Sequence, residues 1–170
     1  DGNAEKPSIS INSEGQIGVS FYDSTYDNLK FALDTGVGWE TETLQSIGDI
    51  GSFNAIGHGP TGLFGISYYD ATSQSLNFIG PSLSPWQIAV EILDGNTNSG
   101  VYLDLKAVGN ELHLVYFSDS FNDLKYMSNP SGSWQTADVS TSGDIGRYCS
   151  LAIDSHGHYS TSYYNSDASS

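Results

Sequence analysis

The sequence predicts an all-β protein with the architecture of a β-propeller, and three observations lead to this fold class. The tryptophans recur 47 and 48 residues apart, and a leucine and an aromatic residue recur with the same two spacings. Their positions are Trp39, Trp86 and Trp134, then Leu29, Leu76 and Leu124, then Tyr22, Tyr69 and Phe117. Each repeat also holds four short segments of alternating, aromatic or β-branched residues that end at Gly, Asn, Asp or Ser. Four strands in ~40–50 residues are typical of a propeller blade.

The first repeat predicts four strands in order, and the later repeats follow it. Its expected strands are 8–15, 18–23, 29–33 and 39–46, and a fourth, shorter unit at 150–165 stops halfway. No window carries an i, i+3, i+4, i+7 apolar stripe, so no helix is expected. We therefore expect a partial propeller of about 3.5 blades, with blades at residues 4–50, 51–97, 98–146 and, incomplete, 147–170. The alternative is a β-sandwich, although a sandwich does not require tryptophan at a fixed spacing.

The composition excludes several classes of partner. Twenty acidic residues against five Lys and Arg give a formal charge of -15, which disfavours nucleic acid and anionic membrane surfaces. No apolar run approaches the ~20 residues of a membrane span. Cys149 is the only cysteine, so a disulfide within the chain and a zinc cluster built on cysteines are excluded. No signal peptide is visible at the start, although a processed chain would look the same.

Several motifs resemble a known family of repeats. They are Ile-Ser-Tyr-Tyr-Asp at 66–70, Leu-Lys-Tyr at 124–126, Gly-Asp-Ile-Gly at 143–146 and Ser-Leu-Ala-Ile-Asp-Ser-His-Gly at 150–157. This pattern resembles the sialidase-like propeller repeats, related to Asp-box repeats, of large secreted bacterial and archaeal proteins. The blade layout is also similar to that of fucose-binding propeller lectins. The resemblance implies a propeller fold and an extracellular or cell-surface location. The sialic acid site of sialidases needs a cluster of arginines, and this chain has only Arg147.

The tryptophans have two interpretations. In the first, Trp39, Trp86 and Trp134 pack between adjacent blades and fill the same gap in each repeat. In the second, which the lectin resemblance implies, they are stacking platforms for sugars in pockets between blades. Under that second interpretation, these three residues and Arg147 are the candidate ligand-binding residues. The tyrosine pairs 68/69 and 163/164 are expected to face the two neighbouring blades and to form core.

Propeller topology sorts the loops onto two faces, and aspartates concentrate on one of them. The candidate metal ligands on that face are Asp23, Asp49, Asp70, Asp94 and Asp144. Aspartate also forms turns, because its side chain bonds its own backbone two residues on. A second interpretation is a Ca²⁺ site, since Ca²⁺ takes several carboxylate and carbonyl oxygens from loops. A third is adaptation to high salt.

We expect a non-catalytic binding or display module, with a glycan or a cell-surface protein as partner. One alternative is a propeller enzyme, either a glycoside hydrolase or a polysaccharide lyase. Another is a structural component of a surface coat or filament. The half unit at the end predicts self-association or the remainder of a longer propeller chain, because an open blade exposes aromatic surface.

Overall fold

The computed structural model describes residues 2–59, 61–81, 88–109 and 111–167. They form three four-stranded antiparallel sheets and one two-stranded sheet. The first sheet contains β1 (Ala4–Ile11), β2 (Ile17–Asp23), β3 (Asn28–Asp34) and β4 (Trp39–Gln45). The second contains β5 (Ile50–His58), β6 (Phe64–Asp70), β7 (Ser75–Pro81) and β8 (Ile88–Asp94). The third contains β9 (Ser99–Val108), β10 (Glu111–Ser118), β11 (Asp123–Ser128) and β12 (Gln135–Ser140). The last contains β13 (Ile145–Ile153) and β14 (Tyr159–Asn165).

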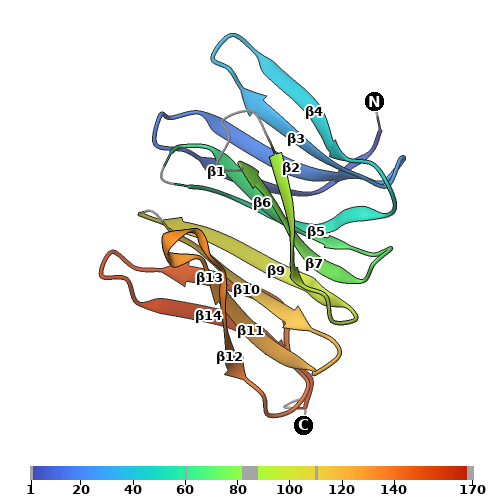
Figure 1. Ribbon diagram of the computed structural model, residues 1–170, viewed down its shortest axis with the longest axis vertical. Helices are drawn as coiled ribbons and strands as arrows, with labels where there is room; N and C mark the ends of the chain where they lie inside the picture. Colours follow the sequence, from blue (N-terminus) through green and yellow to red (C-terminus); the bar gives the residue numbers. More distant parts are fainter. Residues whose placement is uncertain (1, 60, 82–87, 110, 168–170) are drawn as a thin grey trace.

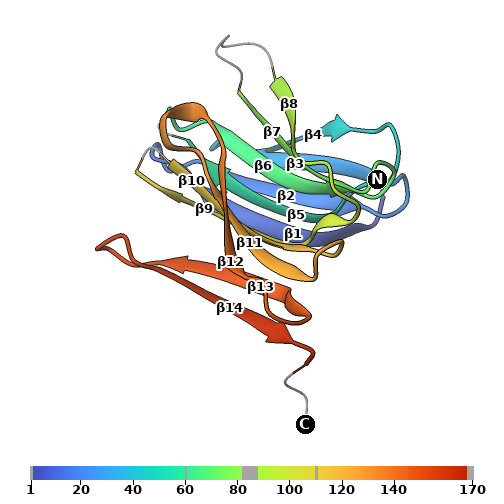
Figure 2. The same ribbon diagram turned by 60° about the horizontal axis from the view of Figure 1, so that its bottom comes forward.

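The four sheets follow one another along the long axis of the molecule (Figure 1). Each complete sheet is a meander in which neighbouring strands along the chain pair with each other. The first strands, β1, β5, β9 and β13, contact one another in turn. They therefore form the inner edge of successive blades, and the later strands fan outward (Figure 2). This is the arrangement of propeller blades, so the predicted fold class is confirmed.

Three apolar clusters lie between successive sheets. Leu29 and Ile66 belong to the cluster between the first and second sheets. Leu76 and Tyr116 belong to the next, and Leu124 and Leu151 to the third. Burial of these faces is the main stabilising contribution, because apolar surface removed from water is worth about 25 cal/mol per Å².

A glycine at the start of each later inner strand explains why the leucine recurs. Gly51, Gly100 and Gly146 all have positive φ, between 95° and 112°. A Cβ on any of the three would lie 2.9–3.0 Å from the recurring leucine of the preceding sheet, Leu29, Leu76 or Leu124. Glycine is required both by the backbone conformation and by this close approach. The repeated Gly–Leu contact thus sets how closely adjacent blades pack.

The structure differs from the sequence expectations in several details. The first strand, expected at 8–15, is β1 at Ala4–Ile11. A 3-10 turn at Pro130–Gly132, which was not expected, precedes β12. Tyr68 and Tyr69 are buried as expected, but Tyr163 and Tyr164 are exposed, because β14 has no third strand or following sheet in the described part of the chain. In the described residues, none of the helical structure has the length and apolarity that crossing a membrane would require.

Candidate functional site

A polar contact recurs where one sheet meets the next. At the first junction the Tyr22 hydroxyl donates to Oδ1 of Asp49 at 2.9 Å, and it lies 2.7 Å from Oδ1 of Asp27. At the second junction the Tyr69 hydroxyl donates to Oδ1 of Asn98 at 2.6 Å. Asp49 and Asn98 occupy the same place, two residues before the glycine of the inner strand. The aromatic residue of each second strand is therefore tied to the start of the next sheet.

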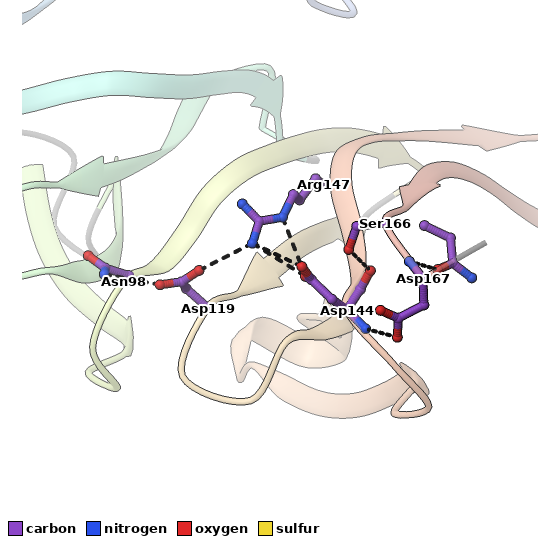
Figure 3. Close-up of polar contacts among 7 residues, drawn as sticks. Asn98, Asp119, Asp144, Arg147, Ser166 and Asp167 are labelled. Carbon is purple, nitrogen blue, oxygen red and sulfur yellow. Dashed lines mark hydrogen bonds and ion pairs between the residues drawn. The ribbon is translucent and has the colours of Figure 1, made fainter. Parts of the chain in front are cut away.

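The third junction replaces this contact with a cation. Phe117 occupies the tyrosine position and has no hydroxyl, and the guanidinium of Arg147 lies 4.8 Å from its ring centroid. Arg147 donates from Nη2 to Oδ2 of Asp144 at 3.3 Å, and Asp144 is the equivalent of Asp49 and Asn98. Oδ1 of Asp119 lies 3.8 Å from the same Nη2 (Figure 3). The only arginine in the chain thus performs the role that the tyrosine hydroxyl performs at the other junctions.

The carboxylates around Arg147 are held in place by further hydrogen bonds. The Asn98 side chain donates to Oδ2 of Asp119 at 3.3 Å, which links this cluster to the second junction (Figure 3). The Ser166 hydroxyl donates to the backbone carbonyl of Asp144 at 2.9 Å. The hydroxyl of Ser166, followed by the guanidinium of Arg147, lowers the pKa of Asp144 below its usual range. Asp144 is therefore charged at neutral pH, and two carboxylates share one cation.

Aromatic rings line a cavity of about 290 Å³ beside this cluster. The ring centroids of Phe53 and Tyr102 lie 5.0 Å apart, and those of Tyr102 and Tyr148 lie 4.3 Å apart. Each of these residues is the second after the glycine of an inner strand, so the rings come from β5, β9 and β13. Tyr148 is 68% exposed, so one ring of the row faces solvent.

The backbone at two of these rings is unusual. Tyr102 and Tyr148 have φ of 61° and 53°, a left-handed conformation that bulky side chains rarely adopt. Both lie where the pairing register of their strand shifts, at a β-bulge. Bulges re-aim side chains, and strained backbone recurs at binding sites. The bulges turn Tyr102 and Tyr148 toward the cavity and toward each other.

The three tryptophans do not share one environment in the structure. Trp134 packs between blades, because its ring meets Phe78 of the second sheet edge-on at 5.3 Å. Trp39 is 55% exposed, so the expectation that it fills the same gap is wrong. Trp134 packs on the preceding sheet, and Trp39 belongs to the first sheet, which has no preceding sheet in the described chain. Trp86 lies outside the described residues.

Aspartates of the candidate metal set are each engaged separately. Asp23, Asp70 and Asp94 accept hydrogen bonds from the backbone amides two residues on, at 2.9–3.1 Å, which confirms their interpretation as turn formers. Asp49 and Asp144 take part in the junction contacts described above. Within residues 2–59, 61–81, 88–109 and 111–167, no three His, Cys, Asp or Glu side chains lie together as metal ligands. The Ca²⁺ site therefore stays a prediction.

Two of the aspartates are buried and carry specific partners. Asp23 pairs with the Lys30 ammonium at 3.0 Å, and Asp94 accepts from the Tyr116 hydroxyl at 2.9 Å. Burial of Asp94 acts to raise its pKa, but the hydrogen bonds from Asn96 and Tyr116 outweigh it, so the pKa is lowered. These two carboxylates stabilise the fold and are committed to their partners.

Sequence reasoning named Arg147 as a candidate ligand-binding residue but did not name Tyr102 or Tyr148, which the structure places beside it. The interval from Phe53 to Tyr102 is 49 residues and the interval from Tyr102 to Tyr148 is 46, unlike the spacing of the tryptophans. A repeat alignment anchored on tryptophan therefore hides them. The signal that could have found them is an aromatic residue two positions after Gly51, Gly100 and Gly146.

Comparison with known proteins shows which solved structures have a similar fold. No family model and no curated protein matches the sequence. The structure is similar to Aleuria aurantia lectin, solved as its N224Q mutant in complex with alpha-methyl-L-fucoside (TM-score 0.66, 16% identity, 93% of this chain and 53% of that chain). It is also similar to the SapL1 lectin in complex with alpha methyl fucoside (TM-score 0.65, 15% identity, 94% of this chain and 57% of that chain). A third similar structure is the NanB sialidase from Streptococcus pneumoniae (TM-score 0.65, 12% identity, 94% of this chain and 28% of that chain).

These similarities concern the fold. Aleuria aurantia lectin is described as a six-bladed β-propeller, and this chain spans about half of its length. The resemblance to fucose-lectin and sialidase-like propellers is therefore confirmed for the architecture.

Proposed function

We propose that this chain is a glycan-binding propeller module, and that it holds a neutral sugar at the site formed by Arg147, Tyr148 and Tyr102. The observation that carries the proposal is the exposed Tyr148 ring beside a fixed guanidinium–carboxylate pair, at the mouth of an open cavity. The lectins of similar fold were solved with fucosides, which supports a sugar as the ligand class.

The chemistry of the site suits a sugar. Tyrosine is amphipathic, so its ring can cover the apolar C–H face of a pyranose while its hydroxyl bonds polar groups. The Arg147 guanidinium presents several donors in a planar fork, and Asp119 presents acceptors on its exposed side. A cavity of about 290 Å³ lies near the low end of small-ligand pockets, which run from roughly 300 to 1,000 Å³. The site therefore suits one monosaccharide unit.

The charge of the site favours a neutral ligand over an anionic one. The Arg147 guanidinium is shared by Asp119 and Asp144, so it is already compensated, and Lys6 is the cation that lines the cavity itself. The chain as a whole carries -15, which repels anions. A sialic acid or a uronic acid would have to compete with two resident carboxylates. Neutral sugars avoid that cost, and the proposal includes an extracellular or cell-surface location, where such glycans are displayed.

Titration with methyl α-L-fucoside and a glycan array, both using the intact chain, test this function. We expect retention of neutral glycans on the array, with a dissociation constant weakened by about tenfold or more in Tyr148→Asn. Asparagine suits this position because it tolerates a left-handed backbone and removes only the ring. Tyr26→Ala is the matched control, since Tyr26 is exposed in the turn between β2 and β3 and does not line the cavity. Retention of anionic glycans alone, no glycan retained, or equal binding by Tyr148→Asn would overturn the proposal.

A further inference from the structure

Lys6 is a charged residue at a position where the other three sheets carry an aromatic ring. The pairing of β1 with β2 and of β5 with β6 makes Lys6 the equivalent of Phe53. Tyr102 and Tyr148 are the equivalents in β9 and β13. Like those two tyrosines, Lys6 has a left-handed backbone, with φ of 51°, and lies where the pairing register shifts. The row of rings along the inner strands therefore ends, at β1, in a cation.

The side chain of Asn54 holds the backbone of Lys6 in place. Its amide group donates to the carbonyl oxygens of Lys6 and Gly51, both at 3.0 Å. Its Oδ1 accepts a hydrogen bond from the Ser20 hydroxyl at 2.6 Å. A left-handed backbone costs free energy at a lysine and persists where the surrounding structure holds it. These hydrogen bonds tie the bulge of β1 to β2 and β5, and they fix the point from which the Lys6 side chain extends.

The charge of Lys6 is available to a ligand. Each of the other four cations has a partner within the chain: the pairs are Lys30 with Asp23, Lys106 with Asp104, Lys125 with the Phe121 ring, and Arg147 with Asp144. Lys6 takes part in none of the ion pairs that the described residues form. In a chain with a net charge of -15, this is a distinctive property of one lysine.

Lys6 lines the same cavity as Tyr102 and Tyr148. The inner strands contact one another in turn from β1 to β13, so Lys6 and Tyr148 stand at opposite ends of the row, with Phe53 and Tyr102 between them. An ammonium group on a flexible stem donates up to three hydrogen bonds and accepts none. It therefore binds ligand oxygens, whereas the rings cover the C–H surface of a sugar.

We infer that Lys6 determines the specificity of this site, by donating a hydrogen bond from its ammonium to a ring hydroxyl of the bound neutral sugar, at the end of the cavity opposite Tyr148. This inference rests on the proposed function. A hydroxyl oxygen is a sufficient acceptor, so the ligand needs no anionic group. A site that hydrogen-bonds a substrate hydroxyl rejects the analogue that lacks it, because the polar group of the site is then left unpaired. The cavity thus selects sugars that carry a free hydroxyl at this one place.

Titration of the full chain with methyl α-L-fucoside and with its monodeoxy analogues, each of which lacks one ring hydroxyl, tests the inference. Lys6→Met keeps an unbranched stem and removes the ammonium, and should bind methyl α-L-fucoside about tenfold more weakly. One monodeoxy analogue should bind the unchanged chain about tenfold more weakly than methyl α-L-fucoside does. Lys6→Met should bind that analogue and methyl α-L-fucoside equally, because the missing hydroxyl and the missing ammonium are partners.

Lys106→Met is the matched control, because it removes the same charge from a lysine that does not line the cavity. Its affinity for methyl α-L-fucoside should equal that of the unchanged chain. If the glycan array retains a different neutral sugar, the methyl glycoside of that sugar and its monodeoxy analogues take the place of the fucosides.

Two results would overturn the inference and leave the proposed function standing. The first is equal affinity of Lys6→Met and the unchanged chain for methyl α-L-fucoside. The second is a loss in Lys6→Met that is the same for methyl α-L-fucoside and for every monodeoxy analogue, since Lys6 would then not contact a hydroxyl. Binding of no neutral glycan by the unchanged chain would instead refute the proposed function, and this inference with it.

Discussion

The hydroxyl of Tyr69 and the side-chain oxygen of Asn98 lie 2.6 Å apart across the junction between the second and third sheets. The Tyr22–Asp49 contact repeats this bond one junction earlier, and Arg147 substitutes for it one junction later, where Phe117 has no hydroxyl. The three junctions therefore share the same packing but use two kinds of polar contact, a tyrosine hydroxyl at the first two and the Arg147 guanidinium at the third. This relationship makes the role of Arg147 testable independently of any ligand.

The first prediction concerns Arg147 and its rescue. Arg147→Met removes the bonds to Asp144 and the cation over Phe117, and should lower the free energy of unfolding by about 1–2 kcal/mol. Adding Phe117→Tyr restores a hydroxyl in reach of Asp144 and should recover about 0.5–1 kcal/mol. Urea unfolding followed by tryptophan fluorescence measures both. A double variant no more stable than Arg147→Met would show that a tyrosine hydroxyl cannot replace the Arg147 contact at this junction.

The second prediction compares two tryptophans that occupy the same position in different repeats. Trp134→Ala empties a half-buried site against Phe78 and should lower the free energy of unfolding by about 2–3 kcal/mol, below the ~3–5 of a fully buried aromatic. Trp39→Ala should change it by less than about 0.5 kcal/mol, because Trp39 is exposed. Urea denaturation of both variants tests the difference, and equal losses would contradict the assignment of Trp134 alone to the junction.

The third prediction concerns pH and Asp94. Because the pKa of Asp94 is lowered in the folded chain, its carboxylate contributes stability above its unfolded pKa of about 4 and loses it as pH falls through the folded value. Asp94→Asn should cost about 1.5–3 kcal/mol at pH 7, the range for bonds to a charged group. The gap between wild type and variant should narrow below about pH 4. Parallel urea titrations from neutral to acidic pH measure the gap, and a constant gap would refute the assignment.

The fourth prediction concerns Ca²⁺. The five candidate aspartates are already bonded to backbone amides, tyrosine hydroxyls, Lys30 or Arg147. We expect CaCl₂ and MgCl₂ at matched ionic strength to raise the melting temperature equally, through screening of the -15 charge. A larger rise with Ca²⁺ that saturates with concentration, and that Asp70→Asn removes, would instead establish a specific site by mass action.

The repeat in the sequence determined the strand order and the blade architecture. Leucine, glycine and tyrosine recur because each junction repeats one packing problem: Leu29 must lie against Gly51, and Leu76 against Gly100. Local alternation and turn residues were enough to place most of the strands, since strand and turn preferences act over a few neighbouring residues. The first strand is the exception, because it was expected at 8–15 and lies at Ala4–Ile11. The role of the aspartates as turn formers was predicted from the same local signals, because an aspartate side chain bonds its own backbone two residues on.

Only the tertiary structure decided which of the equivalent residues in successive repeats pack at a junction between sheets. Trp39 and Trp134 occupy equivalent positions, but one is exposed and the other is packed, because burial depends on whether a preceding sheet lies against that face. The role of Arg147 as a substitute for a hydroxyl is not apparent until the fold brings Phe117 of β10 close to Asp144, in the bend before β13. The tilted ring contact between Tyr102 and Tyr148 likewise depends on bulges in two neighbouring sheets, and the spacing of residues along the chain does not fix the register of those bulges.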